Sequence, residues 1–325
     1  MKPEVLLDPT YIRDNVDYSF GDQSGAGLFN GYMKTANSNN DEFMEKYRKI
    51  KESKDIMTLF IDNIRLYQRP GIKYTALEQK SVEFRKFKDN RVAELSDNDL
   101  LKLCSELPDM KFIIFTAFED TPIDEEIVDK IPDNVLGIYA SNSQYFGGKV
   151  VPIPYGIQRK LHQSDSRHDT LKFKIDERID PEKLLYINHS LGTNPRRIEI
   201  NNHFNNFDWC TVSSPKSISP SDYSTYLNNI KKHKFMICPD GNAIGCECHR
   251  DWEVLYMRRV PVLERSEYLE KIFDGIPVLF VDSFFDVTKE LLEQNENLYD
   301  EMQILDLCNL DMKLIYESIL KQHGL

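Results

Sequence analysis

The sequence has no run of eighteen apolar residues, and this absence excludes an evident membrane-spanning helix. The N-terminal residues MKPEVLLDP also lack the apolar core of a secretory signal, so we expect a cytoplasmic protein. Without such a signal, cysteines that do not form a regular framework are expected to be reduced thiols. The chain has six scattered cysteines: Cys104, Cys210, Cys238, Cys246, Cys248 and Cys308.

Basic residues are outnumbered by acidic ones, and the formal net charge is −12. This total excludes a surface that is basic throughout, as many nucleic-acid-binding proteins have. Lys and Arg do concentrate at 46–54, 80–91 and 158–160, so a local basic groove stays open as an interpretation. The 325 residues, 41% apolar and 29% charged, are enough for two soluble globular domains.

The glycines near the N-terminus do not have the GxGxxG spacing. Residues 4–34 predict a strand at 4–8, a glycine-rich loop at 19–27 and a helix at 28–36. Without the dinucleotide fingerprint, an NAD-dependent dehydrogenase is disfavoured. The loop either faces a ligand or is a plain surface turn.

Apolar runs alternate with amphipathic stretches along the rest of the chain, which predicts α/β domains with mostly parallel sheets. In the second domain five strands, each followed by a helix, predict a doubly wound sheet. We expect Rossmann-like domains at 1–157 and 184–300, a polar linker at 158–183 and C-terminal helices at 301–325. The predicted strands lie at 56–61, 111–118, 135–140, 149–153, 184–188, 209–212, 235–238, 260–263 and 278–281.

Residues 234–266 predict a strand, a loop broken by glycines, a helix and a second strand. A loop that precedes a helix N-terminus presents unpaired N–H groups, to which phosphates bind readily. Arg250 and Glu253 are one helical turn apart, and Glu264 and Arg265 follow a strand at the edge where parallel sheets bind ligands. These residues either line a binding crevice or form two structural ion pairs.

Arg196 and Arg197 fall in the first turn of the helix predicted after Asn194-Pro195. Cations at this place oppose the helix dipole, and an anionic ligand such as a diphosphate would offset that cost. The alternative is that they pair with Glu199 or another nearby acid.

The central stretch resembles the C-terminal signature of exostosin-like glycosyltransferases, most clearly over residues 234–287. This resemblance implies the GT-B architecture, in which two Rossmann-like doubly wound domains face a cleft, and C-terminal helices that pack back toward the first domain. The pair Cys246-Glu247 departs from the family pattern. The matching runs are Pro239-Asp240-Gly241-Asn242, Cys248-His249-Arg250, Trp252-Glu253, Leu255-Tyr256 and Pro261-Val262.

The resemblance implies a hexosyl- or pentosyltransferase that moves a sugar from a UDP-type nucleotide sugar to a hydroxyl acceptor, such as a glycan. No obligatory metal or other cofactor is expected. Two alternatives stay open: a transferase that acts on hydroxymethylated bases in viral DNA, and a noncatalytic nucleotide-sugar-binding protein. The expected donor-binding residues are Arg196, Arg197, Asp240, Gly241, Asn242, His249, Arg250, Glu253, Glu264 and Arg265.

A catalytic base is expected from the loops of the first domain, where Asp22, Glu119 and Asp120 are the candidates and no motif selects one. Cys238, Cys246, Cys248 and His249 suggest zinc, but their spacing matches no common structural site. A Cys248–His249 nucleophile is also disfavoured, because neighbouring helical residues point about 100° apart.

Overall fold

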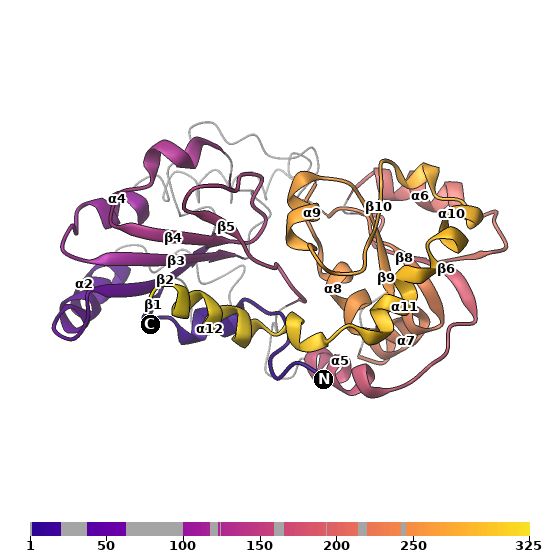
Figure 1. Cartoon of the computed structure of the whole chain (residues 1–325), viewed down its shortest axis with the longest axis horizontal. Helices are drawn as coiled ribbons and strands as arrows, with labels where there is room; N and C mark the ends of the chain where they lie inside the picture. Colours follow the sequence, from indigo (N-terminus) through magenta and orange to yellow (C-terminus); the bar gives the residue numbers. More distant parts are fainter. Residues whose placement is uncertain are drawn as a thin grey trace. The chain divides into compact units, whose positions relative to one another are not determined.

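The computed structural model describes residues 2–20, 38–62, 100–117, 123, 125–158, 166–192, 194–213, 220–241 and 245–325. These residues form two compact units. The N-terminal unit is Pro9–Pro154, and the C-terminal unit joins Met1–Asp8 to Tyr155–Leu325. Each unit contains a five-stranded parallel sheet with helices packed on it (Figure 1).

The strands of the N-terminal unit follow one another across the sheet in the order β1-β2-β3-β4-β5. Crossovers of one hand that always step in one direction leave their helices on one face. In agreement, α2, α4 and the 3-10 helix η2 bury Phe43, Leu101 and Ile127 in the same cluster as Leu59 and Phe112 of the sheet. The elements are α1 (Thr10–Asn15), β1 (Tyr18–Ser19), α2 (Ser38–Lys51), β2 (Ile56–Asp62), α4 (Leu100–Ser105), β3 (Lys111–Ala117), η2 (Glu125–Lys130), β4 (Val135–Ala140) and β5 (Val150–Pro152).

The prediction that both domains are doubly wound is therefore wrong for the described part of this unit. Its strand order has no reversal, and a reversal is what sends helices to both faces.

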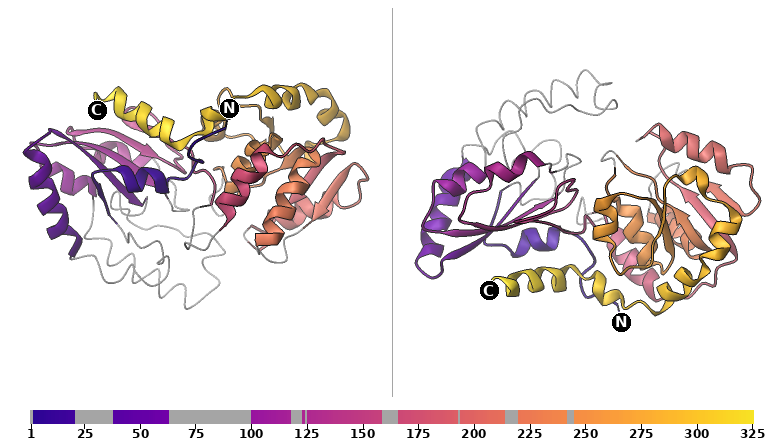
Figure 2. Two further views of the ribbon diagram at one scale, coloured as in Figure 1. Left: turned by 90° about the horizontal axis from the view of Figure 1, so that it is seen from below. Right: turned by 45° about the horizontal axis from the view of Figure 1, so that its top comes forward.

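The strands of the C-terminal unit are ordered β10-β9-β8-β6-β7 and are all parallel. The chain starts in the middle at β6, steps outward to β7 and then returns to the other side of β6 for β8. This reversal confirms the doubly wound sheet predicted for the second domain, and helices lie on both sides of it (Figure 2). The strands are β6 (Lys183–Asn188), β7 (Cys210–Ser213), β8 (His233–Ile237), β9 (Val260–Glu264) and β10 (Leu279–Val281).

Continuous apolar runs form these strands because both faces of the sheet are covered. Leu185, Phe235 and Val262 are fully buried in neighbouring central strands. The other elements are α5 (Arg167–Asp176), α6 (Arg196–Phe204), α7 (Pro220–Lys231), α8 (His249–Tyr256), α9 (Glu267–Ile272), η3 (Phe284–Asp286), α10 (Lys289–Gln294), α11 (Glu296–Ile304), η4 (Leu307–Leu310) and α12 (Met312–Gln322).

Two predicted segments differ from the structure. Residues 4–8 form no strand; Leu6 makes an isolated bridge with Asp311, whose carboxylate accepts the N–H of Val5. The predicted linker 158–183 contains α5, which packs against α7 and buries Leu171. The sequence of α5 shows no regular spacing of apolar residues, because a lysine, Lys174, occupies one of the buried positions of the helix. The packing of residues 301–325 toward the first domain stays a prediction.

Candidate functional site

The reversal of strand order in the C-terminal unit lies between β6 and β8, which are neighbours at the centre of the sheet (Figure 1). In doubly wound sheets the loops that leave two such strands run in opposite directions, and ligands bind in the crevice between them at the carboxyl edge. The loop after β6 contains His189 and Ser190, and the loop after β8 contains Pro239 and Asp240. The crevice expected between these two loops is the candidate site.

Arg197 joins the two loops. Its guanidinium donates to the carbonyl oxygens of Asp240 and Pro239, both at 2.9 Å, and of Ser190 at 3.2 Å. The side chain is buried, and burial, together with the nearby charge of Arg250, lowers its pKa. Because these donors point at the backbone, the geometry favours a structural role over the predicted contact with a diphosphate.

Arg196 is half-exposed and forms a two-point ion pair with Glu264 at the end of β9. Glu264 also accepts the N–H of Phe284 at 2.9 Å, so its carboxylate is fixed from two sides. The alternative that Arg196 pairs with an acid is thus confirmed, with Glu264 as the partner instead of Glu199. Arg196 keeps further N–H donors at the mouth of the crevice.

Arg250 and Glu253 share one face of α8 but do not form an ion pair with each other. Glu253 instead accepts the hydroxyls of Tyr223 and Tyr226, both at 2.9 Å. Burial raises the pKa of Glu253, and the two tyrosine hydroxyls oppose that change. Within the described part of the chain, the guanidinium of Arg250 donates to Sγ of Cys248 at 3.5 Å and has no carboxylate partner.

The charge of Arg250 acts at the crevice. Burial, and after it the charge of Arg250, lower the pKa of His189 to about 4, so this histidine is neutral near pH 7. His189 follows β6, and its Nε2 lies 3.1 Å from the carbonyl oxygen of Arg197. Arg250 is therefore near enough for its charge to act on His189 and on Arg197, which joins the two loops.

Asp240 closes the loop after β8. Its Oδ2 accepts the N–H of Gly245 at 2.9 Å, and Ser266 donates its hydroxyl to the Gly245 carbonyl at 2.9 Å. Gly245 has a φ of +72°, which favours glycine. Gly241 has an ordinary φ, and a Cβ there would be 4.0 Å from Arg197, so sterics do not demand glycine. Asp240 is engaged with the loop itself.

His249 and Arg265 are directed elsewhere. The Nδ1 of His249 donates to the Gly156 carbonyl at 2.7 Å, and its ring stacks on Tyr155. Arg265 pairs with Glu270 and covers the ring of Phe280. Successive residues at a strand end point to opposite sides, which separates Arg265 from Glu264 and the crevice.

Asp251, which the sequence analysis did not single out, caps α8. Its carboxylate accepts the backbone N–H of Cys248 at 2.8 Å and the thiol at 3.1 Å. Burial raises the pKa of Cys248 to about 12, so the thiol stays protonated and cannot act as a nucleophile with His249. The spacing Cys248-x-x-Asp251 is the local signal, since it follows the capping-box pattern. For Tyr223 and Tyr226, the sequence offers only their three-residue spacing, which indicates a shared helix face and does not identify Glu253 as their partner.

Four predicted site residues, Asp22, Glu119, Asp120 and Asn242, lie outside the described residues, as does the basic segment 80–91. Among the residues that the structure describes, no group of three His, Cys, Asp or Glu side chains is arranged to hold a metal ion. In the same part of the chain, every helix is too short or too polar to cross a bilayer.

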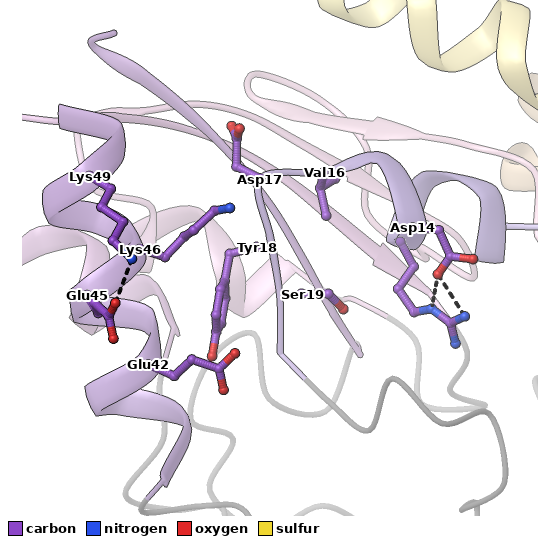
Figure 3. A pocket seen from close by; sticks show the side chains of 10 residues that line it. Asp14, Val16, Asp17, Tyr18, Ser19, Glu42, Glu45, Lys46 and Lys49 are labelled. Atoms are coloured by element: carbon purple, nitrogen blue, oxygen red, sulfur yellow. Dashed lines mark hydrogen bonds and ion pairs between the residues drawn. The ribbon is translucent and has the colours of Figure 1, made fainter. Parts of the chain in front are cut away.

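A separate pocket of about 620 Å³ lies in the N-terminal unit between α2 and β1 (Figure 3). Its lining carries both charges, and much of that charge is paired: Arg13 with Asp14 at 2.8 Å, and Lys49 with Glu45 at 2.6 Å. The paired lining indicates no particular ligand chemistry.

The C-terminal unit thus has the architecture of a doubly wound parallel α/β domain whose strand order reverses between β6 and β8. No protein-family model matches the chain, and no curated protein matches it significantly in sequence. The exostosin-like resemblance is therefore not confirmed and stays a prediction.

A solved structure described as the crystal structure of alpha1,3-fucosyltransferase is similar to this chain, with a TM-score of 0.40 and 11% sequence identity. The similarity covers 78% of this chain and 82% of that chain. A likeness at this level does not establish a shared family or activity.

Proposed function

We propose that this protein is a nucleotide-sugar-dependent glycosyltransferase that moves a sugar from a UDP-type donor to a hydroxyl acceptor such as a glycan. The observation that carries the proposal is Arg250, a partly buried guanidinium without a carboxylate partner among the described residues, near the loop that follows β6. Enclosing a charge is costly unless a counter-charge is present. A bound diphosphate supplies that counter-charge.

Arg196, at the start of α6, supports the same assignment. Glu264 holds its guanidinium in place and leaves other N–H groups free to bind a phosphate oxygen. In glycosyl transfer the bond between the sugar and the diphosphate breaks, and negative charge develops on the departing diphosphate. Fixed cations at that position stabilise the charge and so accelerate the reaction. We expect this arrangement to work without an obligatory metal.

Glu253 is the residue we assign to the nucleoside. A carboxylate accepts two hydrogen bonds at once, and the 2′- and 3′-hydroxyls of ribose are a matching pair of donors. Glu253 lies one helical turn from Arg250, so a nucleotide bound along α8 would place its ribose and its diphosphate on adjacent residues.

The acceptor hydroxyl must lose its proton as it attacks the sugar, and an inverting enzyme uses a carboxylate for that step. Asp22, Glu119 and Asp120 remain the proposed bases. The noncatalytic alternative predicts nucleotide binding without donor hydrolysis or transfer, so a turnover assay with a nucleotide sugar separates the two.

A thermal-shift panel of UDP, GDP and ADP tests the binding site. A diphosphate present at 100 times its Kd should stabilise the protein by about 2.7 kcal/mol. Arg250→Met and Glu253→Gln should each weaken binding tenfold or more, because a hydrogen bond to a charged group contributes about 1.5–3 kcal/mol.

Lys271→Gln is the matched control. It removes one positive charge from the exposed surface of α9 and should leave the shift unchanged. If all three diphosphates leave the wild-type melting temperature where it is, the proposed function is wrong.

A further inference from the structure

Two tyrosines of α7 hold the carboxylate of Glu253. Tyr223 and Tyr226 are three residues apart, so they lie on one face of the helix, and their rings are stacked with 6.0 Å between centroids. The hydroxyl of Tyr223 donates to Oε1 and that of Tyr226 to Oε2, each at 2.9 Å. One tyrosine therefore serves each carboxylate oxygen.

This arrangement fixes the orientation of the carboxylate plane. An ionised carboxylate has about four acceptor positions, two on each oxygen. The tyrosines fill one position on each oxygen and leave one on each, so the remaining acceptors form a pair. Burial raises the pKa of Tyr226 well above its ordinary value, and its hydroxyl therefore stays a donor at any physiological pH.

The charges near Glu253 leave it dependent on these donors. Burial favours the protonated form of Glu253, and the hydroxyls of Tyr223 and Tyr226 are the strongest influences that oppose it. Arg250 on α8 and Arg167 at the start of α5 also favour the ionised form, but more weakly. Loss of the hydroxyls would both free the side chain to rotate and favour its neutral form.

We propose that Tyr223 and Tyr226 are positioning residues that hold Glu253 as a two-point acceptor for the paired hydroxyls of a ribonucleotide. The tyrosines themselves do not touch the ligand. This inference rests on the proposed function, and it adds a requirement that the ligand carry both the 2′- and the 3′-hydroxyl.

Isothermal titration of UDP and 2′-deoxy-UDP into the 325-residue protein tests this role. The wild type should prefer UDP. Tyr223→Phe and Tyr226→Phe should each weaken UDP binding severalfold, and the double variant should bind UDP and 2′-deoxy-UDP about equally. In the double variant, UDP binding should also fall at a higher pH than in the wild type when the pH is lowered, because the pKa of Glu253 rises.

Tyr268→Phe is the matched control. It removes a tyrosine hydroxyl that donates to another buried glutamate, Glu247, at 3.2 Å, and it should change neither the UDP preference nor its pH profile. The inference is overturned if the single and double variants keep the wild-type preference and profile, even where they melt earlier. If the wild type itself binds none of UDP, GDP and ADP, the proposed function fails as well, and the two failures are thereby distinguished.

Discussion

Asp251 is a carboxyl group enclosed at the start of α8, and burial raises its pKa from 3.8 to about 6. A folded-state pKa above the unfolded value gives stability that is complete below about pH 4 and is lost as the pH rises through 6. Asn cannot ionise, so Asp251→Asn removes this dependence. The stability deficit of the variant should be larger at pH 4.5 than at pH 7.5 by roughly 2 kcal/mol.

Urea unfolding of both proteins at the two pH values measures this difference. The other carboxylates are common to both proteins and cancel in the comparison. A deficit that stays the same at pH 4.5 and 7.5 would mean that Asp251 titrates normally.

The sequence predicts which residue types lie near the expected crevice. It predicts less well which of these side chains are available to a ligand and which are bound to other parts of the protein. Arg196 and Arg197 looked equivalent, yet one step along a helix turns the side chain by about 100°, and only Arg197 points at the loop carbonyls. The partners of Glu253 lie 27 and 30 residues away on α7. No local spacing predicts a contact of that range, whereas the cap formed by Cys248 and Asp251 is local, so its three-residue spacing could have predicted it although we did not single it out.

The two adjacent arginines at the start of α6 should have different effects on stability. Arg197→Met leaves three carbonyl groups without their donor, that of Pro239 buried and those of Asp240 and Ser190 partly buried, and we expect it to lower the free energy of unfolding by about 3–5 kcal/mol. Arg196→Met removes a half-exposed ion pair and should change the free energy of unfolding by no more than about 1 kcal/mol. For nucleotide affinity we expect the opposite order: among variants that fold, Arg196→Met should weaken binding more than Arg197→Met.

Denaturant unfolding together with UDP titration checks both halves of this expectation. Equal losses of stability in the two variants would contradict the assignment of Arg197 as the connection between the loops.

Among the elements, the buried parallel strands were the most predictable. Apolar runs such as Leu184–Asn188 predict strands β6, β8 and β9, because a sheet that is covered on both faces needs apolar residues at successive positions of its strands. Residues 4–8 carry a similar apolar run but form no strand, since Asp311, about three hundred residues away, takes up the N–H of Val5. The strand order of the N-terminal unit was also beyond a pattern argument, because a pattern locates strands without ordering them.

In the whole C-terminal unit, the first residues of the chain are part of a network that joins distant segments. The hydroxyl of Tyr256 in α8 donates to the Leu310 carbonyl and accepts the N–H of Leu7, both at 2.7 Å. Leu7 in turn accepts the N–H of Ile157 at 2.7 Å. This network explains why Met1–Asp8 belongs to the same unit as Tyr155–Leu325, which sequence order alone does not suggest.

Gly156 is the tightest point of this network, and its replacement tests how much the network stabilises the unit. Its φ is +72°, and a Cβ there would lie 2.1 Å from the carbonyl oxygen of Leu7, a backbone atom that cannot easily shift. Gly156→Ala should therefore lower the free energy of unfolding by more than about 3 kcal/mol, well beyond the roughly 1–2 kcal/mol of a left-handed alanine alone. Gly275→Ala is the control, because Gly275 has a φ of +73° but no described atom within 4 Å of its Cβ position. Urea unfolding of the two variants separates the contributions, and similar losses would indicate that only backbone conformation matters and that the contact with Leu7 yields without strain.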